Sequence, residues 1–352
     1  MNIEYLIIGQ GISGSFLAYE LEKAGLSYLL IDQPNPFSAS RVASGIINPV
    51  TGRRIVKTWM IDELMPVAWE SYRQLGKEFG IDCIRMTGNI DFFPTPQMRL
   101  AFLDRFQENA QYLTLPANEN DWLDVLNYSF GYGTITPCYL VNMPQLLPAF
   151  RKHFSNQGTL REENFDQKEL ILNSDGIEYQ DIKASKVIFC DGVNGQHNKW
   201  LKNLPFAPNK GEALIVEIMD LPAENILKKA ISLVPWQENL FWVGSSHEWQ
   251  FQTEQPTIAF REKTEAQLKG FLKVPFKVVD HWASVRPATL ERRPFVGFHP
   301  AYPQVGLFNG LGTKGCSLAP YFANQLAQQL TTGTALLAEV NINRFKRVLA
   351  RE

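Results

Sequence analysis

The chain has 352 residues, of which 45% are hydrophobic and 20% charged, a balance typical of a folded globular enzyme long enough for two lobes. Its 34 basic and 36 acidic side chains give a net charge of −2, so no positive field favours binding to nucleic acid. The four cysteines are widely separated and HExxH is absent, which argues against a disulfide framework and predicts no metal site.

The N-terminal residues do not have the pattern of a signal peptide. It lacks the basic region of a signal peptide, and its first apolar run, Tyr5–Ile8, is broken by Gly9. No apolar stretch approaches the roughly 20 residues needed to span a bilayer. We therefore expect a cytoplasmic protein without a transmembrane segment.

The first 32 residues have the pattern of a dinucleotide-binding βαβ unit. Tyr5–Ile8 and Tyr28–Ile31 predict buried strands, and residues 13–24 between them predict a helix. The first turn reads Gly9-Gln-Gly11-Ile-Ser-Gly14, in which glycines allow a tight turn and close approach of the backbone to a pyrophosphate. Asp32 ends the second strand, where a carboxylate accepts hydrogen bonds from a ribose and disfavours the 2′-phosphate of NADP. The unit alone does not separate FAD from NAD.

The remaining chain alternates predicted helices and strands. Helices are predicted over residues 61–80, 97–109, 139–154 and about 318–330. Strands are predicted at Asn89–Pro94, Lys168–Asn173, Gly176–Tyr179, Lys186–Cys190, 211–219, 230–235, 239–245 and Val305–Asn309. This order fits an α/β fold in which a nucleotide-binding lobe is interrupted by an α+β substrate lobe with a mixed or antiparallel sheet. We assign residues 1–60, 131–200 and 281–352 to the first lobe, and 61–130 and 201–280 to the second.

Motifs at several separated places along the chain share one resemblance. They are Gly9–Asp32, Ser38–Pro49, Val187–Gly192, Trp282–Gly297 and Gly310–Pro320. Together they are similar to the D-amino-acid oxidase family, which includes glycine and sarcosine oxidases and the FAD domain of a bacterial tRNA-modifying enzyme. The resemblance implies FAD rather than NAD and makes the first lobe a Rossmann-like FAD-binding lobe. The residues that it assigns to the cofactor are Gly9, Gly11, Ile12, Ser13, Gly14, Asp32, Gln33, Arg41, Ser44, Gly45, Ile46, Asp191, Gly192, Gly310, Gly312, Thr313, Lys314 and Gly315.

Two of these segments have a physical reason to contact a flavin. Ser44-Gly45-Ile46 offers backbone N–H groups and a glycine that lets the chain approach an aromatic ring system. Gly310, Gly312 and Gly315 precede a helix, which makes this turn favourable for an anion. In the family this turn lies by the pyrimidine end of the flavin, so the resemblance gives Lys314 the catalytic role of stabilising the reduced, anionic ring.

Arg286 is the predicted catalytic and substrate-binding residue. It lies in Ser-Val-Arg-Pro-Ala-Thr, which resembles the family element whose arginine holds the substrate carboxylate. A guanidinium suits this role because it is planar, always charged and pairs bidentately with a carboxylate. Asn48, after the flavin loop, is a second substrate-binding candidate. Arg292, Arg293 and His247 are weaker candidates, and Trp236, Trp242 and Trp249 are interpreted mainly as packing residues.

Departures from the family leave two questions open. Some relatives carry a cysteine near the Arg286 element for covalent flavin attachment, whereas Ala283, Ser284 and Val285 occupy that stretch here, which predicts non-covalent FAD. Those relatives also place a lysine over the flavin, and Leu240–Ser246 contains none. Oxidase and dehydrogenase therefore remain alternatives.

The leading hypothesis is an FAD-dependent enzyme that oxidises an amino acid or N-substituted glycine. A hydride would pass from the α-carbon to flavin N5, giving an imine that water hydrolyses. Three alternatives remain: oxidation of a carboxymethylaminomethyl uridine in tRNA, a flavin-carrying subunit of a larger dehydrogenase, and an NAD-dependent dehydrogenase. The expected partner is a small-molecule amine, and the oligomeric state is not predicted.

Overall fold

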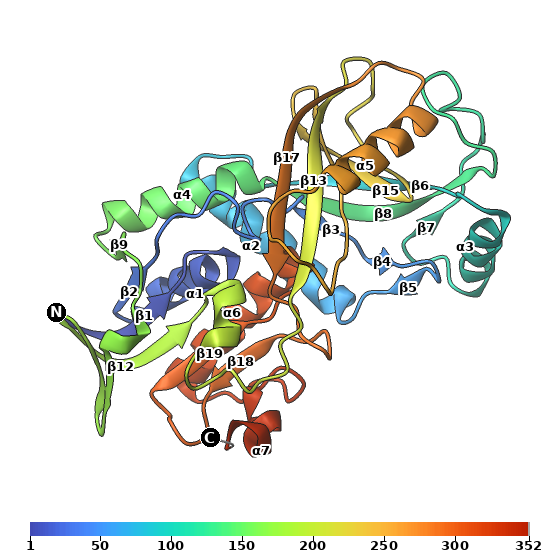
Figure 1. Cartoon of the computed structure of the whole chain (residues 1–352). Coiled ribbons are helices and arrows are strands. Elements are labelled where there is room, and N and C mark those ends of the chain that lie inside the picture. The colour runs from blue at the N-terminus through green and yellow to red at the C-terminus, as the bar shows by residue number, and fades with distance from the viewer. Residues whose placement is uncertain (351–352) are drawn as a thin grey trace.

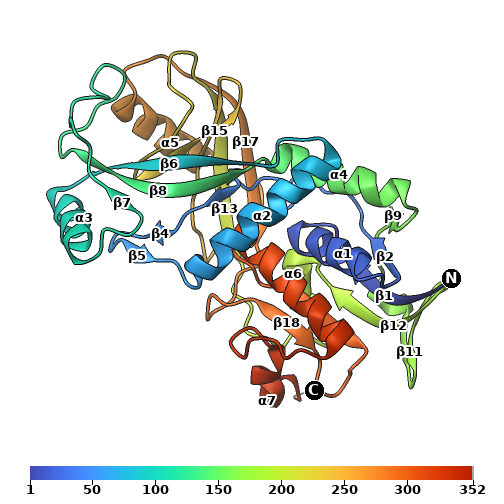
Figure 2. The ribbon, with the colours of Figure 1, turned by 180° about the vertical axis from the view of Figure 1, so that it is seen from behind.

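Two large sheets organise the protein, as a computed structural model that describes residues 1–350 shows (Figures 1 and 2). The chain begins and ends beside the first sheet and builds most of the second with its middle part. The two-sheet, mixed α/β architecture predicted from the sequence is confirmed.

The first sheet contains the βαβ unit. Its central strands β1 (Asn2–Ile8), β2 (Tyr28–Ile31), β12 (Ile182–Phe189) and β19 (Val305–Asn309) are parallel. β2 and β19 are buried throughout, and β1 and β12 are buried toward their C-terminal ends, which explains why these parts of the strands read as apolar runs. The strands at the margins of this sheet are β9 (Leu160–Arg161), β10 (Leu170–Asn173), β11 (Gly176–Tyr179) and β18 (Phe295–Phe298).

Four helices share one core with this sheet (Figure 2). They are α1 (Ile12–Lys23), α2 (Ile61–Phe79), α4 (Met143–Asn156) and α6 (Gly315–Thr332). Short helical turns on the chain are Gln167–Glu169, Gly192–His197, Ile342–Phe345 and α7 (Lys346–Leu349).

The second sheet is mostly antiparallel and runs in the order β17-β13-β16-β15-β14-β6-β8-β3. Its strands are β17 (Lys277–Arg286), β13 (Asn209–Glu217), β16 (Leu240–Gly244), β15 (Ile231–Gln237), β14 (Ile226–Lys229), β6 (Ile84–Phe92), β8 (Tyr132–Val141) and β3 (Ile46–Ile47), with β7 (Leu113–Thr114) beside β8. Helix α5 (Ile258–Phe271) packs on one face. Helix α3 (Pro96–Glu108) and the β4–β5 hairpin (Val50–Thr51, Val56–Lys57) lie at the far end (Figure 1).

Two predicted elements are wrong in their first parts. The strand expected over Lys168–Asn173 begins at Leu170, because Gln167–Glu169 forms a helical turn. The helix expected over residues 139–154 begins at Met143, because Tyr139–Val141 belongs to β8 and pairs with β6 and β3. Asn142 caps the helix through its side chain, and Pro144 lies in the first turn, where its missing N–H is harmless. The lobe boundaries stay a prediction, and pairing places β8 in the second sheet although residues 131–200 were assigned to the first lobe.

Candidate active site

The glycine-rich turn after β1 is packed too closely for any larger residue. Gly9 has φ +100°, and a Cβ on Gly14 would lie 1.9 Å from the Gly9 carbonyl oxygen. Helix α1 begins at Ile12 without a side-chain cap from Gly11 and without an acid in its first turn. Its N-terminus is therefore free of negative charge, as an anion-binding helix end requires.

Asp32 is held by contacts that the sequence did not reveal. Its Oδ1 accepts from the Gln10 N–H at 2.9 Å, and its Oδ2 accepts from Arg151 Nη1 at 2.8 Å. Arg151 comes from α4 and also pairs with Glu162. Each carboxylate oxygen retains a second lone pair for a ribose hydroxyl. Burial lowers the pKa of the nearby Arg41 guanidinium, and the negative charge of Asp32 partly offsets this shift.

The predicted flavin loop lies where the two sheets meet. Gly45 has φ +80°, and a Cβ there would lie 2.0 Å from the Val141 carbonyl oxygen. The following strand β3 joins the second sheet through β8. Trp242 Nε1, from β16, donates to the Val42 carbonyl at 3.0 Å. Ser44 also lines a cavity of about 260 Å³ together with Leu140, Val141 and Trp236, among others.

Asp191 and Gly192, at the end of β12, are fixed by a single amide. Asn309 Nδ2 donates to Asp191 Oδ1 at 3.1 Å and to the Gly192 carbonyl at 2.8 Å. Burial raises the pKa of Asp191 to about 7, although this hydrogen bond acts against the shift. Asn309 is 2% exposed and ends β19, so it joins two of the predicted cofactor segments.

The C-terminal glycine turn presents a second helix N-terminus beside the first. Helix α6 starts at Gly315, again with no side-chain cap and no acid in its first turn. A Cβ on Gly315 would lie 3.2 Å from Cγ2 of Ile12, the first residue of α1. Burial lowers the pKa of Lys314, and the charges of Arg293 and Arg292 lower it further. The N–H of Ile12 donates to Ser40 Oγ at 3.1 Å, a neutral acceptor. Two adjacent helix N-termini with no acid in their first turns and a half-buried lysine form a region suited to negative charge.

Arg286 ends β17 and is surrounded by neutral oxygens. Its Nη1 donates to Asn209 Oδ1 at 2.8 Å and to the Ser246 carbonyl at 3.2 Å, and its Nη2 donates to Ser245 Oγ at 2.8 Å. Within residues 1–350 no carboxylate forms an ion pair with it. Burial lowers its pKa to about 10. The loop after it meets the glycine turn, where the Gly312 N–H donates to the Pro287 carbonyl at 3.1 Å.

Other candidates have structural partners of their own. Asn48 Oδ1 accepts from the Val50 N–H at 3.1 Å, so this amide supports its own loop, and its predicted substrate contact stays a prediction. The Arg293 guanidinium lies 4.2 Å from the ring centroid of Trp59. The Trp59 ring in turn stacks on Phe322 of α6. Two other predicted cofactor residues, Gln33 and Thr313, are exposed. Burial lowers the pKa of His247, and the positive charge of Arg286 lowers it further.

The geometry fits a dinucleotide cofactor with a flavin end. The N-terminus of α1 carries no acid where the sequence predicts the pyrophosphate, Asp32 directly follows β2 where the sequence predicts the ribose, and Gly45 and Gly312 have no side chains at the junction between the sheets.

The sequence profile of the family described as FAD dependent oxidoreductase (DAO) matches residues 4–329. The chain belongs to this family. Glycine oxidase of Pseudomonas aeruginosa (strain ATCC 15692 / PAO1) is 23% identical over 350 residues, which cover 94% of this chain and 95% of the relative. Glycine oxidase of Bacillus subtilis (strain 168) is 24% identical and covers 91% of this chain and 90% of its own length.

Solved structures of the family share the fold over the whole chain. Glycine oxidase from Geobacillus kaustophilus superposes with a TM-score of 0.79 at 18% identity, covering 100% of this chain and 99% of the other. Iminodiacetate oxidase from Chelativorans sp. BNC1 gives 0.78 at 20% identity, with 97% and 98% covered. The protein is therefore an FAD-dependent oxidoreductase with the glycine-oxidase fold.

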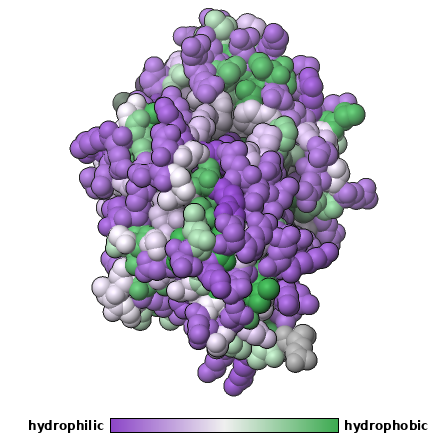
Figure 3. Space-filling view, turned by 90° about the vertical axis from the view of Figure 1, so that its left-hand side faces the viewer, coloured by the Kyte–Doolittle hydropathy of each residue, from purple (hydrophilic) through white to green (hydrophobic). Residues whose placement is uncertain are grey.

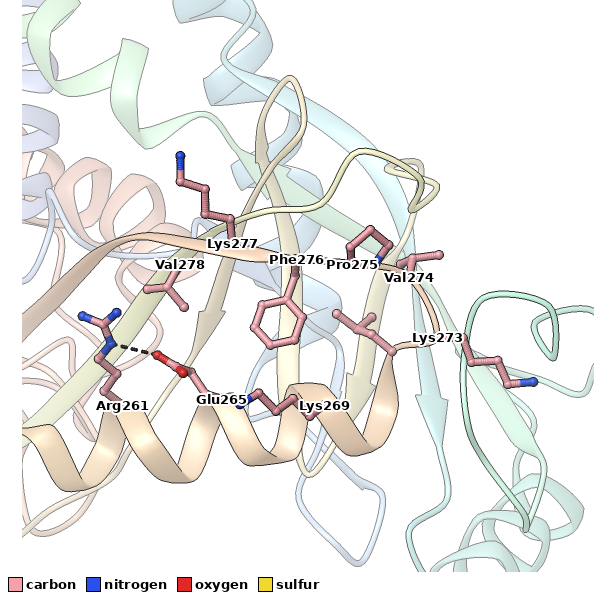
Figure 4. Close-up of a pocket in the computed structure, with 10 residues that line it drawn as sticks. Arg261, Glu265, Lys269, Lys273, Val274, Pro275, Phe276, Lys277 and Val278 are labelled. Carbon is pink, nitrogen blue, oxygen red and sulfur yellow. Dashed lines mark hydrogen bonds and ion pairs between the residues drawn. The ribbon is translucent and has the colours of Figure 1, made fainter.

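A second groove lies away from the candidate site. It has a volume of about 760 Å³ and is lined by residues of α5 and by residues 272–278 leading into β17, with Phe276 pointing between them (Figure 4). None of its lining residues is a predicted site residue. The surface seen in Figure 3 is largely hydrophilic, with hydrophobic side chains in small separate groups. Among residues 1–350, no helix is both long and apolar enough to cross a membrane, and no three His, Cys, Asp or Glu side chains gather as a metal site.

Proposed function

We propose that the protein oxidises the C–N bond of an amino acid or an N-substituted glycine, with Arg286 binding the substrate carboxylate. The observation that carries this proposal is the environment of the guanidinium, which is half-buried and hydrogen-bonds only to neutral oxygens. A buried cation without a counter-ion is unfavourable, and a substrate carboxylate removes that penalty. Glycine and iminodiacetate, after which similar enzymes are named, are both amines that carry a carboxylate.

FAD is proposed to bind without a covalent link. Attachment through sulfur requires a reactive thiolate, and the four cysteines are all buried. Burial raises the pKa of Cys83, Cys138 and Cys316 to about 12 and that of Cys190 well above its usual range. A cytoplasmic location remains a prediction of the sequence.

Bound FAD supplies the two-electron acceptor that the oxidation requires. The planar guanidinium of Arg286 donates hydrogen bonds to both carboxylate oxygens and so orients the substrate. This reduces the entropy that is lost when the α-carbon is aligned for reaction. Lys314 and the N-terminus of α6 place positive charge at the turn where the family's flavin gains negative charge. An amine that arrives neutral needs no protein base, and water hydrolyses the imine that forms.

Anaerobic absorption spectra of the purified protein test the proposal. The panel is D- and L-amino acids, glycine, sarcosine, proline and iminodiacetate. Bleaching of a flavin spectrum by one of them supports it, and re-oxidation in air then separates oxidase from dehydrogenase. A flavin spectrum that none of them bleaches contradicts it and makes tRNA the next substrate to try.

Arg286→Ala tests the residue assignment. Two charge-assisted hydrogen bonds contribute about 1.5–3 kcal/mol each, so the KM for a carboxylate substrate is expected to rise about 100-fold or more, with FAD retained. Arg344→Ala is the matched control, because Arg344 is also half-buried but pairs with Glu291 outside the site. Unchanged kinetics for Arg286→Ala would remove Arg286 from the site.

A further inference from the structure

A buried pair of charges lies directly behind Arg286, on the opposite face of β13. Side chains alternate along a strand, so Asn209 and Gly211 face Arg286, whereas Lys210 and Glu212 face the other way. Lys210 is 0% and Glu212 1% exposed, and Lys210 Nζ lies 3.1 Å from Glu212 Oε1. An apolar pair at these positions is often equally stable, so burial of both charges points to a role beyond stability.

The Glu212 carboxylate connects three elements. Its Oε2 accepts from the Thr257 N–H at 2.6 Å, and its Oε1 accepts from the Thr257 hydroxyl at 2.8 Å. Thr257 is the N-cap of α5, since its hydroxyl also accepts from the Phe260 N–H. Nε2 of His281, on β17, lies 2.9 Å from Glu212 Oε2. One side chain thus ties α5 and β17 to β13, the three elements that lie together in Figure 1.

The backbone of the same strand holds the segment that binds the guanidinium. The Glu212 N–H donates to Ser246 Oγ at 3.0 Å, and the Ser246 N–H donates to the Glu212 carbonyl at 3.3 Å. Lys210 and Glu248 exchange two backbone hydrogen bonds of 2.9 Å. The Ser246 carbonyl accepts from Arg286, and the neighbouring Ser245 hydroxyl does so too. The acceptors of Arg286 are therefore anchored at the residues that carry the buried charges.

We propose that Glu212 is a positioning residue for Arg286. By locking β13, β17 and the start of α5 together, it fixes the Ser245–Ser246 segment and so the direction of the guanidinium. Glu212 touches neither substrate nor cofactor and acts through these contacts. The inference rests on the proposed function, in which Arg286 binds the substrate carboxylate.

The test measures acetate binding to the FAD-loaded enzyme through the change in flavin absorbance, alongside KM and kcat for the substrate. Because small displacements of a binding group have large effects, Glu212→Gln is expected to raise the Kd for acetate and the KM about tenfold, with a smaller change in kcat. Asp91→Asn is the matched control. Asp91 is 1% exposed and pairs with Lys228 at 2.7 Å in the same sheet, so its loss also removes a buried ion pair.

Weaker acetate binding in Glu212→Gln but not in Asp91→Asn, with both unfolding at lower temperature, supports the role. An equal weakening in both variants, or unchanged binding in Glu212→Gln, overturns it. If Glu212→Gln does not fold, two variants of Thr257 replace it: Thr257→Val removes one hydrogen bond to the carboxylate, and Thr257→Ser keeps it. Acetate binding that is weaker in Thr257→Val than in Thr257→Ser supports the role. Equal acetate binding in the two variants overturns it. Acetate binding that Arg286→Ala leaves unchanged removes Arg286 from the carboxylate site of the proposed function. Weaker binding in Arg286→Ala but not in Glu212→Gln overturns only the role of Glu212.

Discussion

Gly211→Ala should displace Arg286 while leaving the rest of the sheet in place. A Cβ built on Gly211 would lie 1.8 Å from Arg286 Nη2, and its three nearest atoms all belong to the same guanidinium. Gly211 is the third residue of β13 and has no positive φ, so alanine fits the backbone there. The strain therefore falls on one flexible side chain.

The size of the effect follows from that distance. An ordinary contact needs about 3.4 Å or more, so the guanidinium has to move by roughly 1.5 Å. A shift of that size breaks at least one of its charge-assisted hydrogen bonds to a carboxylate, each of which contributes about 1.5–3 kcal/mol. We expect the KM for the carboxylate substrate and the Kd for acetate to rise between about 10-fold and 150-fold.

Steady-state kinetics and acetate titration of the FAD-loaded variant measure this effect. Gly270→Ala is the control, because a Cβ on Gly270, in α5, meets nothing within 4 Å. The FAD content of both variants should equal that of the wild type. A folded, FAD-replete Gly211→Ala enzyme with wild-type acetate affinity would refute the placement of Arg286 in the carboxylate site.

Three further changes test the cofactor lobe. Gly14→Ala places a Cβ 1.9 Å from the Gly9 carbonyl oxygen, so the turn must open, and FAD should be lost during gel filtration. Arg151→Gln removes the 2.8 Å contact to Asp32, and we expect about tenfold weaker FAD binding by fluorescence titration of the apoprotein, with an unchanged value excluding the contact from ribose recognition. Asp191, whose pKa burial raises to about 7, keeps its proton in the folded apoprotein between about pH 4 and pH 7 while the unfolded chain loses it, so stability falls as pH rises through this window. The shift can lower the free energy of unfolding by at most about 4 kcal/mol. Asp191→Asn should abolish this fall, measured by denaturant unfolding at pH 5 and pH 8. A fall that persists in the variant would show that another group causes it.

Much of the first lobe is predictable from sequence because its signals are local. The spacing of Gly9, Gly11 and Gly14 between an apolar strand and a helix has one common structural solution, and the structure has that turn. Strands such as Gly176–Tyr179 and Val305–Asn309 have the predicted bounds, since short runs with aliphatic and aromatic residues end at turn residues. These features need only neighbours within a few residues.

The surroundings of the site depend on tertiary structure. Arg151 contacts Asp32, which is 119 residues away in the sequence, and Asn209 contacts Arg286, which is 77 residues away. No local sequence pattern predicts either contact. Residues 139–141 looked helical because a short apolar run reads alike in a helix and in a buried strand until its partner strand is known. The sequence by itself determined the cofactor unit and the family resemblance and predicted the arginine. Only the packing of β13, β16 and β17 decided that this arginine is half-buried without an acidic partner and lies on the opposite face of β13 from Glu212. The reason is physical: spacing along the chain sets local conformation, whereas burial and counter-ions are set by strands that are distant in sequence and adjacent in the sheet.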